Sequence, residues 1–302
     1  MQHQPVLLAE TLSQLQIIPN GIYLDATFGR GGHSASILAQ LGQNGRLLAM
    51  DQDPEAATCA QQQFASDKRV IFNRRSFTQM AQWVNQMGLL GCVNGVLMDI
   101  GLSSPQLDNP ERGFSFLRDG PLDMRMDCTQ GETAAMWIAN ASASEMVKIF
   151  KRYGEERFAN RIAAAIVRAR QINAIVSTSQ LAHIVAQAHP RWPPHIHPAT
   201  KVFQAIRIHI NQELTALSLG LAQSVQVLAQ GGRLAVITFH SLEAQCVKHF
   251  VRQMNSVSDD FNAPSMLPVM KWIQSKIKPS AKEIEENPRA RSALLRVMEK
   301  LR

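Results

Sequence analysis

The sequence predicts an α/β fold in which a Rossmann-like parallel sheet is interrupted by a helical insertion. In the first hundred residues, short apolar runs alternate with segments of helical periodicity. This alternation is typical of βαβ units around a buried parallel sheet. The alternation stops after Ser104-Pro105, and helical patterns then continue as far as a further strand-like run, Arg233–Phe239. A sheet domain that is interrupted and later completed accounts for both observations.

Four apolar runs predict the strands in the first part of the sheet. Each run is short and has Gly, Asp or Ser at its C-terminal edge, where a strand passes into a turn. The predicted strands are Ile22–Ala26, Gly45–Met50, Arg69–Phe72 and Val93–Met98. The helices predicted between them are Ser34–Leu41, Pro54–Phe64 and Phe77–Met87.

The middle of the chain predicts a long loop followed by helices. Leu107–Thr129 is rich in Gly, Pro, Asp and Arg, which is typical of an ordered loop. Capping boxes at Ser142–Glu145 and Ser177–Gln180 predict two helix starts. A long helix is expected over Thr200–Leu228, before a turn at Gly231-Gly232. The predicted domains are the first part of the core at 1–106, the helical insertion at 107–198, and the completed core with a basic tail at 199–302.

Composition excludes several classes of protein. Hydrophobic residues make up 45% of the chain and charged residues 18%, which is ordinary for a globular domain. No apolar run approaches the roughly 20 residues of a membrane span, and the start MQHQPVLLAE lacks the features of a secretory signal. The four cysteines form no CxxC pair, so neither a disulfide framework nor a zinc knuckle is indicated. We therefore expect a reduced, cytoplasmic protein with no membrane partner.

The net charge of +7 is unevenly distributed. Glu145–Gln171 contains seven Lys and Arg against three Glu, and Lys271–Arg302 contains nine Lys and Arg against four Glu. Two basic stretches on an otherwise near-neutral chain favour a polyanionic partner such as nucleic acid. Solvated helix faces are the alternative.

A glycine-rich turn follows the first predicted strand. Gly29, Gly31 and Gly32 lie immediately before a segment with helical periodicity. Glycine lets backbone N–H groups approach a ligand, and a helix N-terminus adds positive potential. The spacing fits a dinucleotide-binding motif imperfectly because Ser34 stands where a third glycine is expected. A purely structural turn is the alternative.

Carboxylates follow three of the predicted strands. Asp25, Asp51 and Asp99 stand at strand ends, and ligands of open α/β sheets bind outside these ends. We therefore expect the three carboxylates to converge, with Asp51 placed to accept the hydroxyls of a ribose. Phe77 is a candidate for contact with adenine, with a place in the core as the alternative. Three acids favour an adenosine-like ligand with a cationic end, S-adenosylmethionine, over a nicotinamide dinucleotide.

The chain resembles a bacterial family of small-subunit ribosomal RNA (cytosine-N4) methyltransferases, the MraW-like proteins, over nearly its whole length. The segments that carry the resemblance are HQPVLLAE, TFGRGGHS, DIGLSSPQLDNPERGFSFLRDGPLDMRMD, YGEERFANRIAAAI, HPATKVFQAIRIHINQEL, GGRLAVITFHSLE and ENPRARSALLR. The resemblance implies a Rossmann-like S-adenosylmethionine-dependent methyltransferase domain with an inserted helical domain for substrate recognition. It also implies that the substrate is a cytidine in the decoding region of 16S ribosomal RNA.

The resemblance also implies a set of cofactor contacts. Carried over residue by residue, these are Gly31, Gly32, His33, Asp51, Phe77, Asp99 and Gln106. Gly31, Asp51 and Asp99 are also the residues that the strand ends and the glycine turn indicate without the resemblance.

The reaction requires groups that orient the N4 amine and accept its hydrogen bonds, because the N4 lone pair is delocalised into the ring. Many amino methyltransferases use an Asp/Asn-Pro-Pro-aromatic tetrapeptide here, and that tetrapeptide is absent from this chain. We hypothesise that Ser103 and Ser104 accept from N4 while Asp99 borders the cofactor. His240 is a candidate proton relay, with a hydrogen-bonded structural histidine as the alternative.

Candidate RNA-binding residues fall in three places. Residues of the long loop are expected either to line a pocket for the extruded base or to form an internal ion-pair network; they are Arg112, Phe114, Asp123, Arg125 and Asp127. Glu243 is expected to face the same crevice. Candidate phosphate contacts are Arg157, Arg161, Arg168, Lys201, Arg207, Arg289 and Arg291. No metal is expected at His189, His195 and His197, because their proline-rich loop fixes no ligand geometry.

Several alternatives stay open from the sequence. The partner is either small-subunit ribosomal RNA or the assembled small ribosomal subunit, and the sequence does not decide between a monomer and a homodimer. The alternative functions are an RNA-binding ribosome-assembly factor with a cofactor pocket, a nicotinamide oxidoreductase, and a methyltransferase acting on another nucleic acid or a protein.

Overall fold

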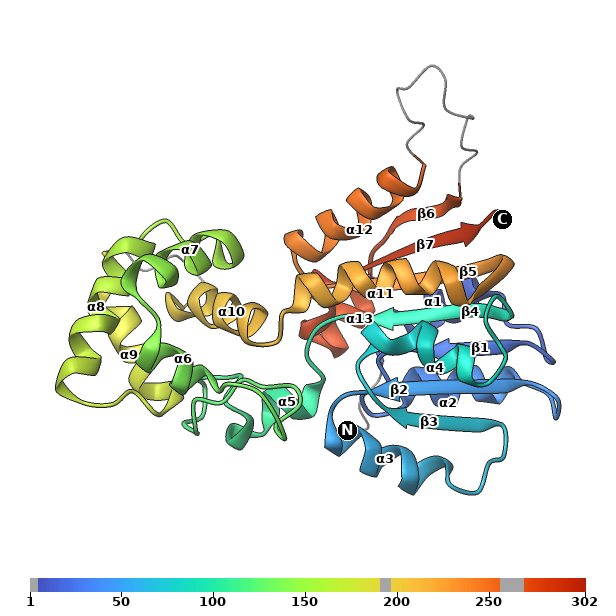
Figure 1. The fold of residues 1–302 in the computed structure, drawn as a ribbon, viewed down its shortest axis with the longest axis horizontal. Helices are drawn as coiled ribbons and strands as arrows, with labels where there is room; N and C mark the ends of the chain where they lie inside the picture. The colour runs from blue at the N-terminus through green and yellow to red at the C-terminus, as the bar shows by residue number, and fades with distance from the viewer. Residues whose placement is uncertain (1–4, 191–196, 256–268) are drawn as a thin grey trace, which may run out of the picture. The chain divides into compact units, whose positions relative to one another are not determined.

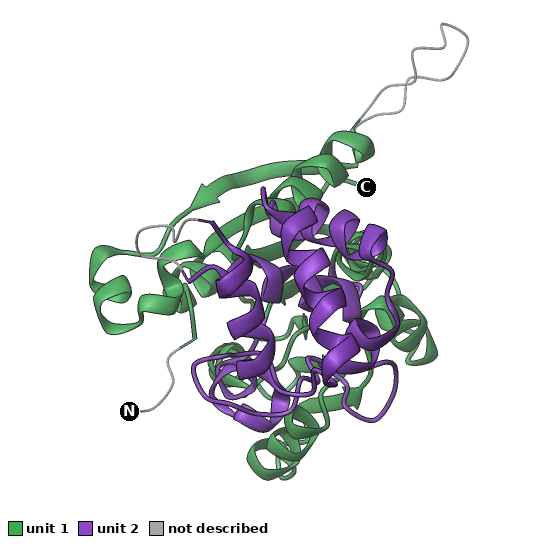
Figure 2. Cartoon of the chain, turned by 90° about the vertical axis from the view of Figure 1, so that its left-hand side faces the viewer, with its two compact units in different colours: residues 1–101, 214–302 green, residues 102–213 purple. Residues whose placement is uncertain are grey.

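The computed structural model describes residues 5–190, 197–255 and 269–302. The chain divides into two compact units, coloured separately in Figure 2. The sheet unit comprises residues 1–101 and 214–302, and the helical unit comprises residues 102–213. The sequence placed these divisions at 106/107 and 198/199. The helical unit extends further towards the C-terminus because α10 (Ala199–Ile210) packs on α7 (Ala143–Gly154) inside it.

The sheet unit contains one seven-stranded sheet of order β3-β2-β1-β4-β5-β7-β6 (Figure 1). Its strands are β1 (Ile22–Asp25), β2 (Arg46–Asp51), β3 (Val70–Arg74), β4 (Val93–Asp99), β5 (Leu228–Thr238), β6 (Met270–Ile277) and β7 (Leu294–Lys300). The first five strands pair in parallel, and β7 runs antiparallel to β5 and β6. The predicted α/β class and the four predicted parallel strands are confirmed. The sequence did not predict the antiparallel pair β6 and β7.

Helices cover both faces of this sheet. On one face, α1 (Leu8–Leu15) and α2 (Gly32–Gln40) pack on side chains such as Tyr23, Leu47 and Leu97, and α3 (Pro54–Phe64) packs beside them. The other face, with Leu24 and Leu48, is covered by α4 (Met80–Gln86), α11 (Glu213–Val227) and α12 (Ser241–Met254). Alternate residues of each central strand are therefore buried on opposite faces, and each large aliphatic side chain contributes about 1.5–3 kcal/mol.

The helical unit is built around a core of its own. Its helices are α5 (Ser104–Asp108), η2 (Pro110–Arg112), α6 (Ala134–Asn140), α7, α8 (Ala159–Ile172), α9 (Thr178–Ala188) and α10. Met146, Phe150, Ile162, Ile166 and Phe203 are buried together in this core. Both predicted helix starts are confirmed: the hydroxyl of Ser142 accepts from the Glu145 N–H, and that of Ser177 accepts from the Gln180 N–H. The reciprocal bond of a capping box is present at Ser177, whose N–H donates to the Gln180 side chain, whereas the Glu145 side chain accepts from Trp137 instead.

The helix predicted over Thr200–Leu228 is wrong as a continuous element. It is broken into α10 and α11 by Asn211 and Gln212, and Gln212 adopts a left-handed φ of 49°. The Asn211 side chain donates to the Met124 carbonyl and accepts from the Met126 N–H, which fastens this break to the long loop. Helical periodicity continues across the break, so the sequence pattern alone does not reveal it.

The tail completes the sheet unit with α13 (Ala281–Glu286) and η3 (Pro288–Ser292), which precede β7. Within the part of the chain that the structure describes, no helix is both long and apolar enough to cross a membrane.

Two glycines of the long loop provide a test of how that loop packs in the helical unit. Gly113 and Gly131 both have left-handed φ values, +71° and +81°. A Cβ on Gly113 would lie 2.3 Å from the Pro121 carbonyl oxygen, whereas a Cβ on Gly131 would meet nothing within 4 Å. Both substitutions to alanine should lose about 1–2 kcal/mol to the left-handed conformation. Gly113→Ala should lower the free energy of unfolding, measured in urea, clearly more than Gly131→Ala does. Equal losses in the two variants would contradict the close contact between Gly113 and Pro121.

Candidate active site

The ends of β2, β1 and β4 place three carboxylates on one face of the sheet. Asp25 lies opposite Ala49 and Leu97, so Asp51 and Asp99 each extend two residues beyond it on the flanking strands. All three alternate in phase with residues on the face that α2 covers. Because neighbouring strands lie about 4.8 Å apart, Asp51 and Asp99 stand roughly 10 Å from each other. The expected convergence of the three strand-end carboxylates is therefore present in the sheet unit.

Asp25 forms the base of this group and holds the glycine turn to the sheet. Its carboxylate accepts from the Ser34 hydroxyl at 2.7 Å and from the Thr27 N–H at 3.1 Å, and only 1% of the residue is exposed. Burial raises the pKa of Asp25 to about 6. Ser34 thus stands in place of a third glycine because its hydroxyl stabilises a buried carboxylate. In the sequence, Ser34 is visible only as a departure from a motif.

Asp51 is held by the backbone of two loops. One of its oxygens accepts from the Gly29 N–H at 2.8 Å, and the other accepts from the Asp53 N–H at 2.9 Å. Burial raises the pKa of the Asp51 carboxyl to about 6. The Gln52 N–H is a third backbone donor to this carboxylate. A carboxylate has about four lone-pair sites, so this fixed group can still accept a hydroxyl hydrogen bond.

The glycine turn owes its composition to the protein's own packing. Gly31 has a φ of +76°, and a Cβ there would lie 2.6 Å from the Phe28 ring. A Cβ on Gly32 would lie 2.4 Å from the Pro5 ring. Gly31 is also the N-cap of α2 and makes no side-chain cap, so no side chain of the cap residue covers the first N–H groups of this helix. The turn therefore offers a helix N-terminus suited to a carboxylate.

His33 lies in the first turn of α2, beside Asp99. Its Nε2 is 3.1 Å from the Val6 carbonyl oxygen, and its Nδ1 is 3.8 Å from Oδ2 of Asp99. Because a carbonyl oxygen only accepts, Nε2 must carry the hydrogen of that bond. In a neutral ring, Nδ1 then presents a lone pair towards Asp99.

Asp99 has the most perturbed carboxylate of the three. Its backbone N–H donates to the Thr27 hydroxyl at 2.7 Å, but Oδ1 is buried and has no hydrogen-bond partner among the described residues. The pKa of Asp99 is raised to about 8, first by burial and then by the negative charges of Asp25 and Glu243. The side chain as a whole is 26% exposed, so its second oxygen borders open space.

Phe77 begins η1 (Phe77–Gln79), just after β3, and is half-buried. Its ring packs against α11, where a Cβ on Gly220 would come within 2.6 Å of it. Phe77 is thus fixed in the sheet unit with part of its surface exposed, and both interpretations from the sequence, adenine contact and core packing, remain predictions.

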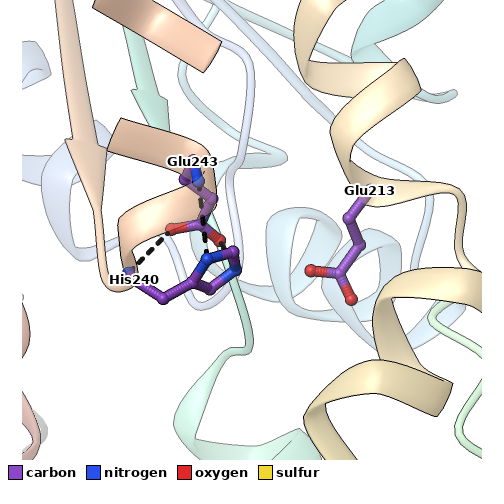
Figure 3. A group of neighbouring side chains, drawn as sticks. All are labelled: Glu213, His240 and Glu243. Atoms are coloured by element: carbon purple, nitrogen blue, oxygen red, sulfur yellow. Dashed lines mark hydrogen bonds and ion pairs between the residues drawn. The ribbon is translucent and has the colours of Figure 1, made fainter. Parts of the chain in front are cut away.

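His240 and Glu243 form a capping box at the start of α12 (Figure 3). Glu243 accepts from the N–H groups of Phe239 and His240, and the His240 ring accepts from the Glu243 N–H. The other ring nitrogen of His240 lies 2.9 Å from Oε1 of Glu243. Glu243 is fully buried and caps α12, and its expected contact with RNA stays a prediction. The sequence contained the signal, an H-x-x-E spacing after a strand.

Residues of the helical unit that were assigned to catalysis or cofactor binding also cap a helix. Ser103 precedes α5, and its N–H donates to Oε1 of Gln106 at 2.9 Å. Gln106 is buried, and this bond occupies its amide oxygen. Ser104 is the first residue of the helix. The roles of Ser103, Ser104 and Gln106 towards a substrate or cofactor stay predictions.

The long loop contains the internal network that the sequence offered as one alternative. Arg125 forms a bidentate ion pair with Asp123, with one N···O distance of 2.7 Å. Arg112 is buried and donates to the carbonyls of Arg125 and Met126. Phe114 is buried in the core of the unit. Asp127 accepts from nearby residues of its own turn. A base pocket formed by these residues stays a prediction.

The candidate phosphate-binding residues differ in whether their side chains are exposed or already bonded to other residues of the protein. Arg157, Arg161 and Arg291 are exposed, the first two in the helical unit and the third in η3. Arg207 instead forms a bidentate ion pair with Glu213 at 2.7 and 2.8 Å, and Lys201 donates to the Glu155 carbonyl. Exposure therefore favours Arg157, Arg161 and Arg291 over Arg207 as groups able to reach a ligand.

The histidines of the proline-rich loop have structural contacts. His189 packs on Phe158, with Nε2 3.7 Å from Oε1 of Glu156. His197 accepts from the Ala199 N–H and packs on Phe116. His195 lies outside the described residues.

Comparison with known proteins identifies the family. The sequence model of the MraW methylase family matches residues 1–301. The chain belongs to this family. Ribosomal RNA small subunit methyltransferase H of Legionella pneumophila (strain Paris) is 51% identical, and the alignment covers 99% of both chains. The proteins of the same name from Alteromonas mediterranea and Thioalkalivibrio sulfidiphilus are 51% and 50% identical and are covered over 98% and 97% of their length. The resemblance drawn from the sequence motifs is confirmed.

The raised pKa of Asp99 in this MraW-family chain predicts a pH-dependent gain in stability on substitution. A carboxyl whose pKa is higher in the folded than in the unfolded state lowers the free energy of unfolding as pH rises between the two values. That window runs from about 4, the unfolded value, to about 8. Asp99→Asn should therefore raise the melting temperature of the ligand-free protein at pH 8 and lose this advantage towards pH 4.

Asp67→Asn is the matched control for this measurement. Hydrogen bonds from Arg69 lower the pKa of the Asp67 carboxyl, so its substitution should give no gain at any pH. A gain for Asp99→Asn that is equal at pH 5 and pH 8 would contradict the assigned electrostatics.

Proposed function

We propose that this protein transfers the methyl group of S-adenosylmethionine to N4 of a cytidine in the decoding region of small-subunit ribosomal RNA. The observation that carries the proposal is the edge formed by Asp25, Asp51 and Asp99 beside the N-terminus of α2, in a chain that a methylase family matches from end to end. The enzyme is an S-adenosylmethionine-dependent methyltransferase. The names of its relatives, which are small-subunit ribosomal RNA methyltransferases, support the choice of substrate.

The residues at the edge of the sheet fit the four chemical parts of this cofactor. Asp51 suits the ribose hydroxyls, and the half-buried ring of Phe77 suits adenine. The N-terminus of α2, whose cap residue is a glycine, suits the methionine carboxylate. Asp99, with a buried oxygen that has no hydrogen-bond donor among the described residues, suits the positively charged sulfonium. A dinucleotide fits less well, because its pyrophosphate would lie among carboxylates.

When bound, the cofactor supplies an electrophilic methyl group on a sulfonium. The protein must then align the N4 amine with that group and accept the hydrogen bonds of N4. We assign this acceptance to Ser103 and Ser104. We keep His240 as a proposed proton relay: its Nδ1 accepts from the Glu243 N–H, and its buried Nε2 lies 2.9 Å from Oε1 of Glu243 with no hydrogen-bond partner among the described residues.

The helical unit is proposed to recognise the RNA. Its exposed Arg157 and Arg161, together with Arg291 of the sheet unit, can neutralise phosphates and so position the RNA. We propose that the reaction takes place in the cytoplasm, on either free small-subunit RNA or the assembled subunit. An RNA-binding assembly factor that does not transfer methyl groups is the second candidate, and the basic stretches alone would support it equally.

Transfer of labelled methyl groups separates these candidates. The purified protein should place label from S-adenosylmethionine into N4-methylcytidine of small-subunit RNA, identified by nucleoside mass spectrometry. Asp51→Asn should bind both S-adenosylmethionine and S-adenosylhomocysteine about tenfold or more weakly, because a charged hydrogen-bond acceptor is worth about 1.5–3 kcal/mol. Isothermal titration calorimetry measures this loss.

Asp67→Asn serves as the control here as well, because Asp67 forms its ion pair with Arg69 before β3, at the opposite end of the strands. RNA binding without any labelled cytidine, on free RNA and on subunits alike, would favour the assembly factor. Label in another base or in protein would refute the proposed acceptor.

The arginines of the helical unit predict a change in the salt dependence of RNA binding. Arg157→Ala combined with Arg161→Ala should weaken binding to all RNA sequences alike and lower the salt slope by about one for each phosphate that is no longer neutralised. Asn160→Ala, an exposed neutral change between them, should leave both quantities unchanged. Filter binding at several salt concentrations measures the slope, and an unaltered slope in the double variant would remove these arginines from the RNA interface.

A further inference from the structure

The carboxylates at the sheet edge have no Lys or Arg partner within the part of the chain that the structure describes. Among the described residues, no Lys or Arg forms an ion pair with Asp25, Asp51 or Asp99. Asp25 and Asp51 each accept at least two hydrogen bonds that stabilise a negative charge. Asp99 differs from both, because its Oδ1 is buried without a donor. Of the three, Asp99 is the group least able to remain ionised in the free protein.

The groups around Asp99 point to the same conclusion. Asp25 on β1 and Glu243 on α12 act on it through negative charge, and both side chains are buried. Glu243 in turn faces the ring of His240, the cap of α12. On α2, the Nδ1 atom of His33 lies 3.8 Å from Oδ2 of Asp99, with Nε2 engaged by the Val6 carbonyl. When the His33 ring is neutral, two unprotonated acceptors face each other, which is unfavourable, and one proton on Asp99 removes the conflict.

We propose that Asp99 carries a proton in the free enzyme, releases it when the sulfonium cofactor binds, and accepts the proton that N4 loses on methylation. The inference rests on the proposed function and adds to it a specific acceptor for the proton. A cation placed beside Asp99 supplies the positive charge that its surroundings lack, so ionisation of the carboxyl becomes favourable. Loss of the methyl group leaves an uncharged sulfur, and the carboxylate then becomes a base.

The step balances in atoms and charge. The N4 lone pair forms a bond to the methyl carbon while the bond between carbon and sulfur breaks, and the sulfur keeps that electron pair. The methylated amine is then cationic and passes one proton to the Asp99 carboxylate. Sulfonium plus carboxylate has become thioether plus carboxylic acid. The summed charge of sulfur and Asp99 is therefore zero before and after transfer.

This linkage distinguishes cofactor from product by charge. Below the pKa of Asp99, about 8, a ligand with a positive charge at the sulfur position must displace a proton when it binds, so its affinity rises with pH. Above that pH, its affinity no longer depends on pH. S-Adenosylhomocysteine has no charge on sulfur and leaves the proton in place. The ratio of affinities for cofactor over product should therefore rise about tenfold per pH unit between pH 6 and 7.5 and become constant above about pH 8.5.

Calorimetry on the intact wild-type protein tests the proposal directly. Binding enthalpies measured in two buffers with different heats of ionisation give the number of protons released. At pH 7, S-adenosylmethionine and the cationic analogue sinefungin should each release nearly one proton more than S-adenosylhomocysteine. Equal release by ligands with and without a positive charge at the sulfur position would overturn the proposal without touching the proposed function.

Variants identify the group that carries the proton. Asp99→Asn should abolish the difference in proton release and make the affinity ratio independent of pH, whereas Asp51→Asn should weaken all three ligands and keep the difference. His33→Gln should also keep it, because the proton resides on Asp99. Retention of the difference in Asp99→Asn would overturn the assignment. Failure of all three ligands to bind wild-type protein would instead count against the proposed function.

Discussion

Concentrated negative charge at one edge of the sheet is the constraint on which the sheet unit depends. Asp25, Asp51 and Asp99 occupy three adjacent strands on one face, and Glu243 acts on Asp99 from the start of α12. Buried charges of one sign lose hydration and repel one another. The compensating donors are Thr27 and Gly29 in the turn after β1, Ser34 at the start of α2, and Asp53 in the turn after β2. The conformation of these turns and the positions of the carboxylates therefore determine each other.

The parts of the fold that sequence predicted are those fixed by short-range patterns. The strands β1 to β4 are apolar runs, and capping boxes such as Ser177–Gln180 stand at real helix starts. The antiparallel strands β6 and β7 escaped prediction because β7 contains the buried Arg296, and β6 alternates weakly between buried and exposed residues. The break between α10 and α11 escaped for a different reason: it depends on Asn211 bonding to a loop some 85 residues away.

The candidate site shows a similar division. Strand-end carboxylates were predictable, because the carboxyl ends of parallel strands must meet at one edge. The roles of other polar residues were less so, since a buried side chain is often engaged by nearby backbone before any ligand. Gln106 and Glu243 both cap helices, and Arg112 supports a loop, while their predicted contacts with ligands stay predictions. The spacing S-x-x-Q at Ser103–Gln106 is the same signal that correctly located α9.

Among the residues that the structure describes, the sheet edge has no Lys or Arg partner, and this connects stability with function. A Lys or Arg placed against Asp99 would neutralise the cluster and stabilise the free protein, but it would also occupy the position that suits a cationic ligand. In the described part of the chain the cluster is compensated by neutral donors alone, on Asp25 and Asp51. Neutral hydrogen-bond donors hold these carboxylates in place but do not neutralise their negative charge. The free protein is therefore less stable than it would be with a paired cluster, but the cluster attracts a cationic ligand. Such a loss of stability is common at sites whose polar groups find their partners only in a bound ligand.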